Sequence, residues 1–118
     1  MSLEEQGWQR IGPVDAFEIG CIAPRKMLDQ YGREVELAVT RTSNGLDVIV
    51  DRCPHQGVAL TANGCLNKRN QLVCKLHDWT FNLPNGTAGD ARGVNLHTVE
   101  YQVQDATLWV RPDPDTFY

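Results

Sequence analysis

Two short segments that each pair a cysteine with a histidine constrain this chain more than any other feature of its sequence. Cys53 and His55 have the spacing C-x-H. Cys74 and His77 have the spacing C-x-x-H and follow after residues 56–73, a stretch long enough for a strand and its turns. Two neighbouring loops would therefore bring two thiolates and two imidazoles to one point. Thiolate is a softer ligand than imidazole. A binuclear iron–sulfur cluster can bind both kinds of ligand, with the cysteines on one iron and the histidines on the other.

Zinc is the alternative metal for this ligand set, because it binds two cysteines and two histidines with tetrahedral geometry. Structural zinc sites usually begin with two cysteines two to four residues apart, which places both thiols on one turn. Here each cysteine is instead followed by a histidine. The pattern favours the iron–sulfur cluster and leaves two alternatives: a zinc-stabilised interaction module, or buried thiols and ordinary histidines that bind nothing.

The four spacings resemble the signature of the Rieske [2Fe-2S] family, in which C-x-H is followed, after a similar spacer, by C-x-x-H. The runs His55–Gly57 and His77–Trp79 are most similar to soluble Rieske ferredoxins and to the Rieske domains of ring-hydroxylating oxygenases. The resemblance covers roughly residues 34–110. It implies one Rieske-type [2Fe-2S] cluster held by four ligands: Cys53, His55, Cys74 and His77.

Four neighbours of these ligands are expected to shape the surroundings of the cluster: Pro54, Gly57, Asp78 and Trp79. Pro54 is expected to stiffen the first loop, and Gly57 to allow a tight turn whose amides face sulfur. Trp79 is expected to pack under the cluster as a hydrophobic shield, or to be an ordinary core aromatic. Asp78 is either a hydrogen-bonding neighbour of the site or a solvated loop residue.

The chain departs from the respiratory members of the family at four positions near the ligands. Those members carry two cysteines, joined by a disulfide, where this chain has Val58 and Leu76. They carry serine and tyrosine hydroxyls where it has Trp79 and Phe81. Fewer hydroxyl donors mean less stabilisation of the reduced, more negative cluster. The resemblance therefore implies a reduction potential near the low end of the Rieske range, which spans about −150 to +300 mV.

Short alternating runs separated by Gly, Pro and Asn turns predict an all-β fold, an antiparallel sandwich or barrel. Strands are expected at Trp8–Ile11, Phe17–Ile19, Glu34–Thr40, Leu46–Val50, Gln71–Val73, Thr80–Leu83, Leu96–Val103 and Thr107–Val110. No confident helix is expected, and Leu46–Val50 is expected to be central because it is almost continuously apolar. This agrees with the Rieske fold, in which two ligand loops form a small cluster-binding subdomain.

The length of 118 residues predicts one domain, 1–118, with a cluster-binding lobe at about 52–83 and a tail at 111–118. The net charge of −4 argues against nucleic acid as a partner. No membrane span or secretory signal is visible, so a cytoplasmic location is expected, with Cys21 and Cys65 as buried free thiols.

These features favour an electron carrier that is not itself an enzyme. The resemblance implies a ferredoxin that takes single electrons from a flavin reductase and passes them to a terminal oxygenase. The alternative is a Rieske domain or small subunit of a multicomponent oxygenase or reductase. A complete oxygenase also needs a mononuclear iron held by two histidines and a carboxylate. Only His97 remains outside the cluster motif, so this chain cannot form that triad alone.

Overall fold

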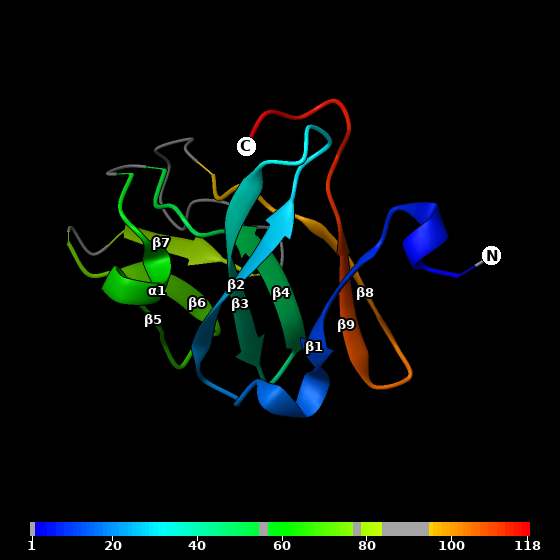
Figure 1. Cartoon of the computed structure of the whole chain (residues 1–118). Helices are drawn as coiled ribbons and strands as arrows, with labels where there is room; N and C mark the ends of the chain where they lie inside the picture. The colour runs from blue at the N-terminus through cyan, green and yellow to red at the C-terminus, as the bar shows by residue number, and fades with distance from the viewer. Residues whose placement is uncertain (1, 55–56, 77–78, 84–94) are drawn as a thin grey trace.

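The computed structural model describes residues 2–54, 57–76, 79–83 and 95–118, and it is built almost entirely from antiparallel strands (Figure 1). The strands form three three-stranded sheets. The first has the order β1 (Gln9–Pro13), β9 (Thr107–Arg111), β8 (Glu100–Gln104). The second has the order β2 (Ile22–Leu28), β3 (Glu34–Thr42), β4 (Gly45–Val50). The third has the order β5 (Gly64–Leu66), β6 (Gln71–Cys74), β7 (Trp79–Asn82).

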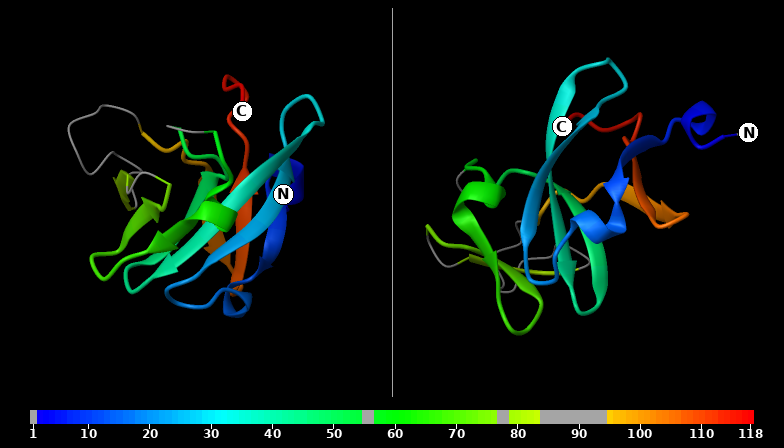
Figure 2. Two further views of the ribbon diagram at one scale, coloured as in Figure 1. Left: turned by 90° about the vertical axis from the view of Figure 1, so that its left-hand side faces the viewer. Right: turned by 60° about the horizontal axis from the view of Figure 1, so that its bottom comes forward.

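The sheet β2-β3-β4 is the middle layer, because its two faces contribute to two different hydrophobic clusters. One face packs with the sheet β1-β9-β8 around a cluster that includes Leu37, Val48 and Leu108. The other face carries Ala38 and Ile49, which pack with side chains of the sheet β5-β6-β7. Figure 2 shows the same order of the sheets from two further sides. The fold is therefore the antiparallel all-β architecture expected from the sequence.

Tight turns join the strands where the sequence predicts them. The β3–β4 hairpin turns before Gly45, which has a φ of 125°. The β8–β9 hairpin turns at Asp105 and Ala106, whose φ angles are 53° and 58°. Both residues therefore adopt the left-handed conformation that a two-residue hairpin turn of this type requires.

The expected strand at Phe17–Ile19 is wrong. A 3-10 turn, η2 (Val14–Ala16), precedes Phe17, whose side chain is buried, whereas Ile19 is 66% exposed. The second strand is instead β2, which the sequence reading missed because its polar residues and Pro24 hide the alternation. Proline is tolerated there because β2 lies at the edge of its sheet.

The expected central position of Leu46–Val50 agrees only in part, because β4 is the last strand of its three-stranded sheet but residues 97–99 pair with its outer side. Its continuous apolar run reflects burial on both faces. Thr98 forms an isolated antiparallel bridge with Ile49 beside it, so the expected strand at Leu96–Val103 divides into this bridge and β8.

Short helical turns complete the described part of the chain: η1 (Glu4–Gln6), η2 and the four-residue α1 (Leu60–Asn63). None of the described helices is long and apolar enough to cross a membrane. All four cysteines are free thiols. Cys21 is exposed and Cys65 only half-buried, so the expectation that both are buried is wrong for Cys21.

The C-terminal residues are packed against the fold. β9 runs to Arg111, so the irregular segment begins at Pro112. The side chain of Tyr118 packs against the hydrophobic cluster between the middle sheet and the sheet β1-β9-β8. The Gln30 amide in the β2–β3 turn donates hydrogen bonds to the carbonyls of Pro114 and Thr116, at 3.1 and 3.2 Å. In Figure 1 this red segment lies beside the β2–β3 turn.

Candidate metal centre

The structure brings the two motif cysteines together although the chain separates them. Cys53 follows the end of β4 by three residues, and Cys74 is the last residue of β6. Both side chains are buried, at 0% and 1% exposure, they belong to the same hydrophobic cluster, and Cys53 is close enough to Cys74 to raise the pKa of its thiol. Two soft, buried sulfur donors side by side suit one iron of a cluster.

The first loop turns back on itself directly after its cysteine. The Cys53 N–H donates to the Val58 carbonyl at 2.8 Å, and the Gly57 N–H donates to the Cys53 carbonyl at 2.7 Å. Gly57 has a φ of 71°, which an L side chain rarely adopts, so glycine is required by the backbone as the sequence predicted. Its own amide hydrogen is used by the Cys53 carbonyl. Pro54 is exposed.

The short helix α1 connects the two loops. At its start, the Asp51 carboxylate accepts hydrogen bonds from the Thr61 backbone N–H at 2.8 Å and from the Thr61 hydroxyl at 2.6 Å. At its end, the Asn63 carbonyl accepts the N–H of Lys75 at 2.8 Å. Asp51 precedes Cys53 and Lys75 follows Cys74, so α1 links the residues beside both cysteines. Sequence reading missed Asp51 and Thr61, because nothing in their local pattern shows that they meet.

Apolar side chains surround the cysteine pair. Leu60, Leu72 and Phe81 are fully buried in the same hydrophobic cluster as both cysteines, and Trp79 belongs to it as well. Burial raises the pKa of the Cys74 thiol, and the neighbouring Cys53 side chain raises it further, while a backbone hydrogen bond from Leu76 opposes them. Without a metal this thiol therefore keeps its proton, and a bound metal would have to displace that proton.

The remaining motif residues lie outside the described part of the chain: His55, Asp78 and His77. Respiratory members carry bridging cysteines at the positions of Val58 and Leu76. Here Val58 is half-buried and Leu76 is 48% exposed. His97 lies beside the end of β4 and stacks on Tyr118, with ring centroids 4.7 Å apart. Within the described ranges no group of three His, Cys, Asp or Glu side chains is placed to hold a metal.

The fold and the site define an all-β domain in which cysteines from two consecutive loops meet in an apolar setting. The family model described as the Rieske [2Fe-2S] domain matches residues 7–100. The chain therefore belongs to the Rieske [2Fe-2S] domain family, and this membership implies a Rieske-type [2Fe-2S] cluster. The paired cysteine sulfurs fit such a cluster because they supply the two thiolates of one iron.

Comparison with known proteins gives relatives of two kinds. The ferredoxin component of an alkene monooxygenase system from Xanthobacter autotrophicus is 24% identical over 103 residues, covering 87% of this chain and 73% of that protein. The ferredoxin of carbazole 1,9a-dioxygenase from Nocardioides aromaticivorans IC177 has the same fold, with a TM-score of 0.73 at 20% identity, covering 90% and 98% of the two chains. The terminal oxygenase of carbazole 1,9a-dioxygenase from the same organism matches with a TM-score of 0.72 at 18% identity, covering 94% of this chain but 31% of the oxygenase.

Proposed function

We propose that this protein is an electron carrier of the ferredoxin type, which transfers one electron at a time through a Rieske [2Fe-2S] cluster. The observation that carries the proposal is the buried pair of sulfurs from Cys53 and Cys74 in a chain of the Rieske family. The cluster, when bound, supplies reversible one-electron chemistry. The ferredoxin component of the alkene monooxygenase system supports the choice of a carrier, because this chain matches most of that protein's length.

In this proposal Cys53, His55, Cys74 and His77 are the cluster ligands. Residues of about 52–83 form the cluster-binding lobe of a single domain, 1–118, in which Leu60, Leu72 and Phe81 exclude water from the thiolate side of the centre. The electron donor would be a flavin reductase and the acceptor a terminal oxygenase. A cytoplasmic location is proposed as well, and the free state of all four cysteines is consistent with a reducing compartment.

A second candidate is a Rieske domain or small subunit within a larger oxygenase or reductase. The match to 31% of a terminal oxygenase favours it, because the same fold occurs there as part of a larger chain. The two candidates differ in what the purified protein can do. A carrier reduces an added oxygenase in a second-order reaction, whereas a subunit co-purifies with its catalytic partner and remains bound to it.

The test is low-temperature electron paramagnetic resonance of the dithionite-reduced protein, with iron and zinc quantified on the same sample. Two irons per chain and a rhombic signal with a low average g-value are expected. Replacing Cys53 by serine should abolish the signal, whereas replacing the exposed Cys21 by serine should leave it unchanged. A silent spectrum with stoichiometric zinc would overturn the electron-transfer proposal.

A further inference from the structure

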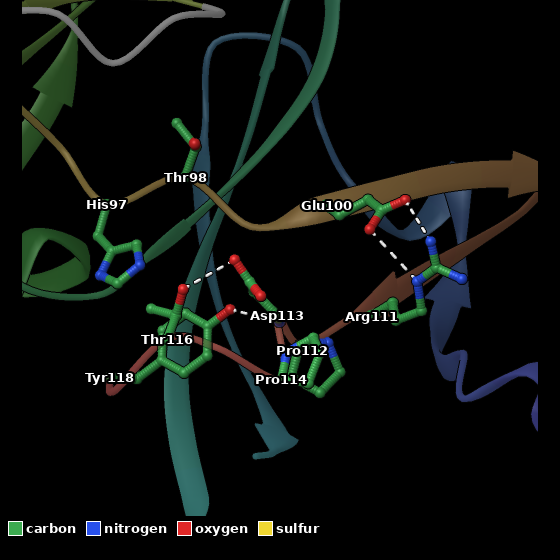
Figure 3. Close-up of a pocket in the computed structure, with 9 residues that line it drawn as sticks. All are labelled: His97, Thr98, Glu100, Arg111, Pro112, Asp113, Pro114, Thr116 and Tyr118. Carbon is green, nitrogen blue, oxygen red and sulfur yellow. Dashed lines mark hydrogen bonds and ion pairs between the residues drawn. The ribbon is translucent and has the colours of Figure 1, made fainter. Parts of the chain in front are cut away.

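The C-terminal segment Pro112–Tyr118, called here the C-terminal strap, crosses the end of the molecule near the first ligand loop. It borders a cleft of about 720 Å³, which is also lined by His97, Glu100 and Arg111 (Figure 3). Ion pairing holds Arg111 to Glu100, at 2.8 Å from Nη2 to Oε1. Within this cleft Arg111 bonds to Glu100, and Asp113 bonds to Thr116 and Tyr118, so the polar contacts of the strap lie largely within its own fold.

Hydrogen bonds give the strap a defined shape. The Asp113 N–H donates to the Tyr118 hydroxyl oxygen at 2.8 Å, and the Thr116 hydroxyl donates to the Asp113 carboxylate at 2.9 Å. The Asp115 N–H donates to the same carboxylate at 2.9 Å. Together with the two hydrogen bonds from Gln30, these contacts fix the position of the Tyr118 ring.

The Tyr118 ring lies against two parts of the chain that control the base of the first loop. It stacks on His97, with ring centroids 4.7 Å apart and an interplanar angle of 26°. It also lines a second cleft, of about 470 Å³, together with Arg52 and Gly57 of the first loop. Tyr118 therefore faces Arg52 and Gly57 across a cleft that is also lined by residues of β3 and the end of β4.

Backbone hydrogen bonds connect His97 to the residues that precede Cys53. Its carbonyl accepts the N–H of Val50 at 2.8 Å, and the Val50 carbonyl accepts the N–H of Arg52 at 2.7 Å. Arg52 immediately precedes Cys53. Burial and the positive charge of Arg52 both lower the pKa of His97, in agreement with an imidazole enclosed near that side chain. A contiguous path thus runs from Tyr118 through His97 and the end of β4 to the first cysteine.

We propose that the C-terminal strap holds the first ligand loop in place, and that Tyr118 and His97 are positioning residues for the loop that carries Cys53. This inference rests on the proposed function, because it assigns the loop to the cluster. The ring of Tyr118 supports the loop from one side while α1 holds it from the other, so loss of the ring would loosen the loop and leave the sheets intact.

Hydrogen exchange of the cluster-loaded, full-length protein tests the proposal directly. In Tyr118→Ser, we expect the amides of Cys53 and Gly57 to exchange several-fold faster, because their hydrogen bonds close the loop. The amides of β8 and β9 should be unaffected. Tyr118→Phe keeps the ring but loses the hydroxyl oxygen that accepts the Asp113 N–H, so its loop amides should exchange at rates between those of the wild type and Tyr118→Ser. Phe117→Ser is the matched control, since Phe117 is 80% exposed and stacks on Tyr31.

Release of iron to a chelator provides the second measurement. It should be several-fold faster in Tyr118→Ser and unchanged in Phe117→Ser. Unchanged exchange in the first loop of Tyr118→Ser, or equally faster exchange in all three sheets, would overturn the proposal. If the wild type lacks the Rieske signal, the proposed function fails separately, and exchange in the first loop still shows whether the strap holds it.

Discussion

At the scale of single residues, Asp47 is the charged side chain that the described part of the chain buries most fully. It lies on β4, opposite Thr40 of β3, and is 6% exposed. Burial raises the pKa of its carboxyl group from 3.8 to about 6. The negative charge of Asp47 adds to burial in raising the pKa of Tyr101.

This pKa makes the contribution of Asp47 to stability depend on pH. Between about pH 4 and pH 6 the carboxyl group is protonated in the folded protein and ionised in the unfolded chain, so folding takes up a proton. The contribution is therefore fully present below pH 4 and is lost as the pH rises through about 6. At neutral pH, Asp47 destabilises the fold.

Asp47→Asn should remove this penalty. We expect the variant to gain about 2–3 kcal/mol in free energy of unfolding relative to the wild type between pH 4 and pH 7, since the pKa is raised by about two units and each unit is worth about 1.4 kcal/mol. Denaturant unfolding at several pH values measures the difference, with the exposed Asp15→Asn as the matched control. Parallel pH profiles for the wild type and Asp47→Asn would contradict the expectation.

At the scale of elements, β7 determines which side chains lie beside the second loop. Trp79 and Phe81 are both buried in the cluster that contains the motif cysteines, and their rings are 6.5 Å apart. Neither residue offers a hydroxyl group. This part of the site therefore shields the proposed cluster and lacks the hydroxyl donors that stabilise negative charge on its sulfurs in respiratory members.

The wild-type protein should have a reduction potential below about +100 mV, in the lower part of the Rieske range. Phe81→Tyr adds a hydroxyl group at a position where respiratory members carry one, and should raise the potential. Phe17→Tyr makes the same change in the other hydrophobic cluster and should leave the potential unaltered. Redox titration followed by electron paramagnetic resonance measures all three, and a wild-type value above about +100 mV would refute the expectation.

Comparison of the expected with the observed strands shows which parts of the fold the sequence predicts. β3 was predicted because Val35, Leu37 and Val39 alternate toward one cluster. β2 was missed because an edge strand needs apolar residues on little of its surface. The apolar run of β4 predicted its burial on both faces, but such a run does not show that the partner on one side is only a short bridged segment at Thr98.

The sequence predicts the site residues whose role shows in local spacing, and it does not predict those whose role depends on tertiary contacts. The spacing of Cys53 and Cys74 from their histidines identified them, and the structure brings the two sulfurs together. The bonds from Thr61 to Asp51 link residues ten positions apart whose types are common in any loop. His97 remains outside the cluster motif in the sequence, and its stacking on Tyr118 follows only from the path of the C-terminal strap.

At the scale of the whole molecule, the middle sheet separates two hydrophobic clusters with different dependence on metal. The cluster shared with β1-β9-β8 contains neither of the motif cysteines. The cluster shared with β5-β6-β7 contains both of them. Loss of the metal should therefore weaken one side of the molecule much more than the other.

Removal of iron under reducing conditions should accelerate hydrogen exchange in β5–β7 several-fold and change little in β1, β8 and β9. Mass spectrometry of the cluster-loaded and iron-free proteins compares the sheets. Uniformly faster exchange in all sheets would contradict the expectation, because the three layers would then unfold as one cooperative unit.

The placement of the two chain ends has a practical consequence for protein engineering. Tyr118 shares a cleft with Arg52 and Gly57, whereas the N-terminal turn η1 lies on the side of the molecule away from β5–β7 (Figure 1). Polypeptide fused after Tyr118 would start beside the cleft that Tyr118 shares with Arg52 and Gly57. An affinity tag or reporter fused before η1 leaves that end of the molecule accessible, so amino-terminal fusions suit assays of electron delivery.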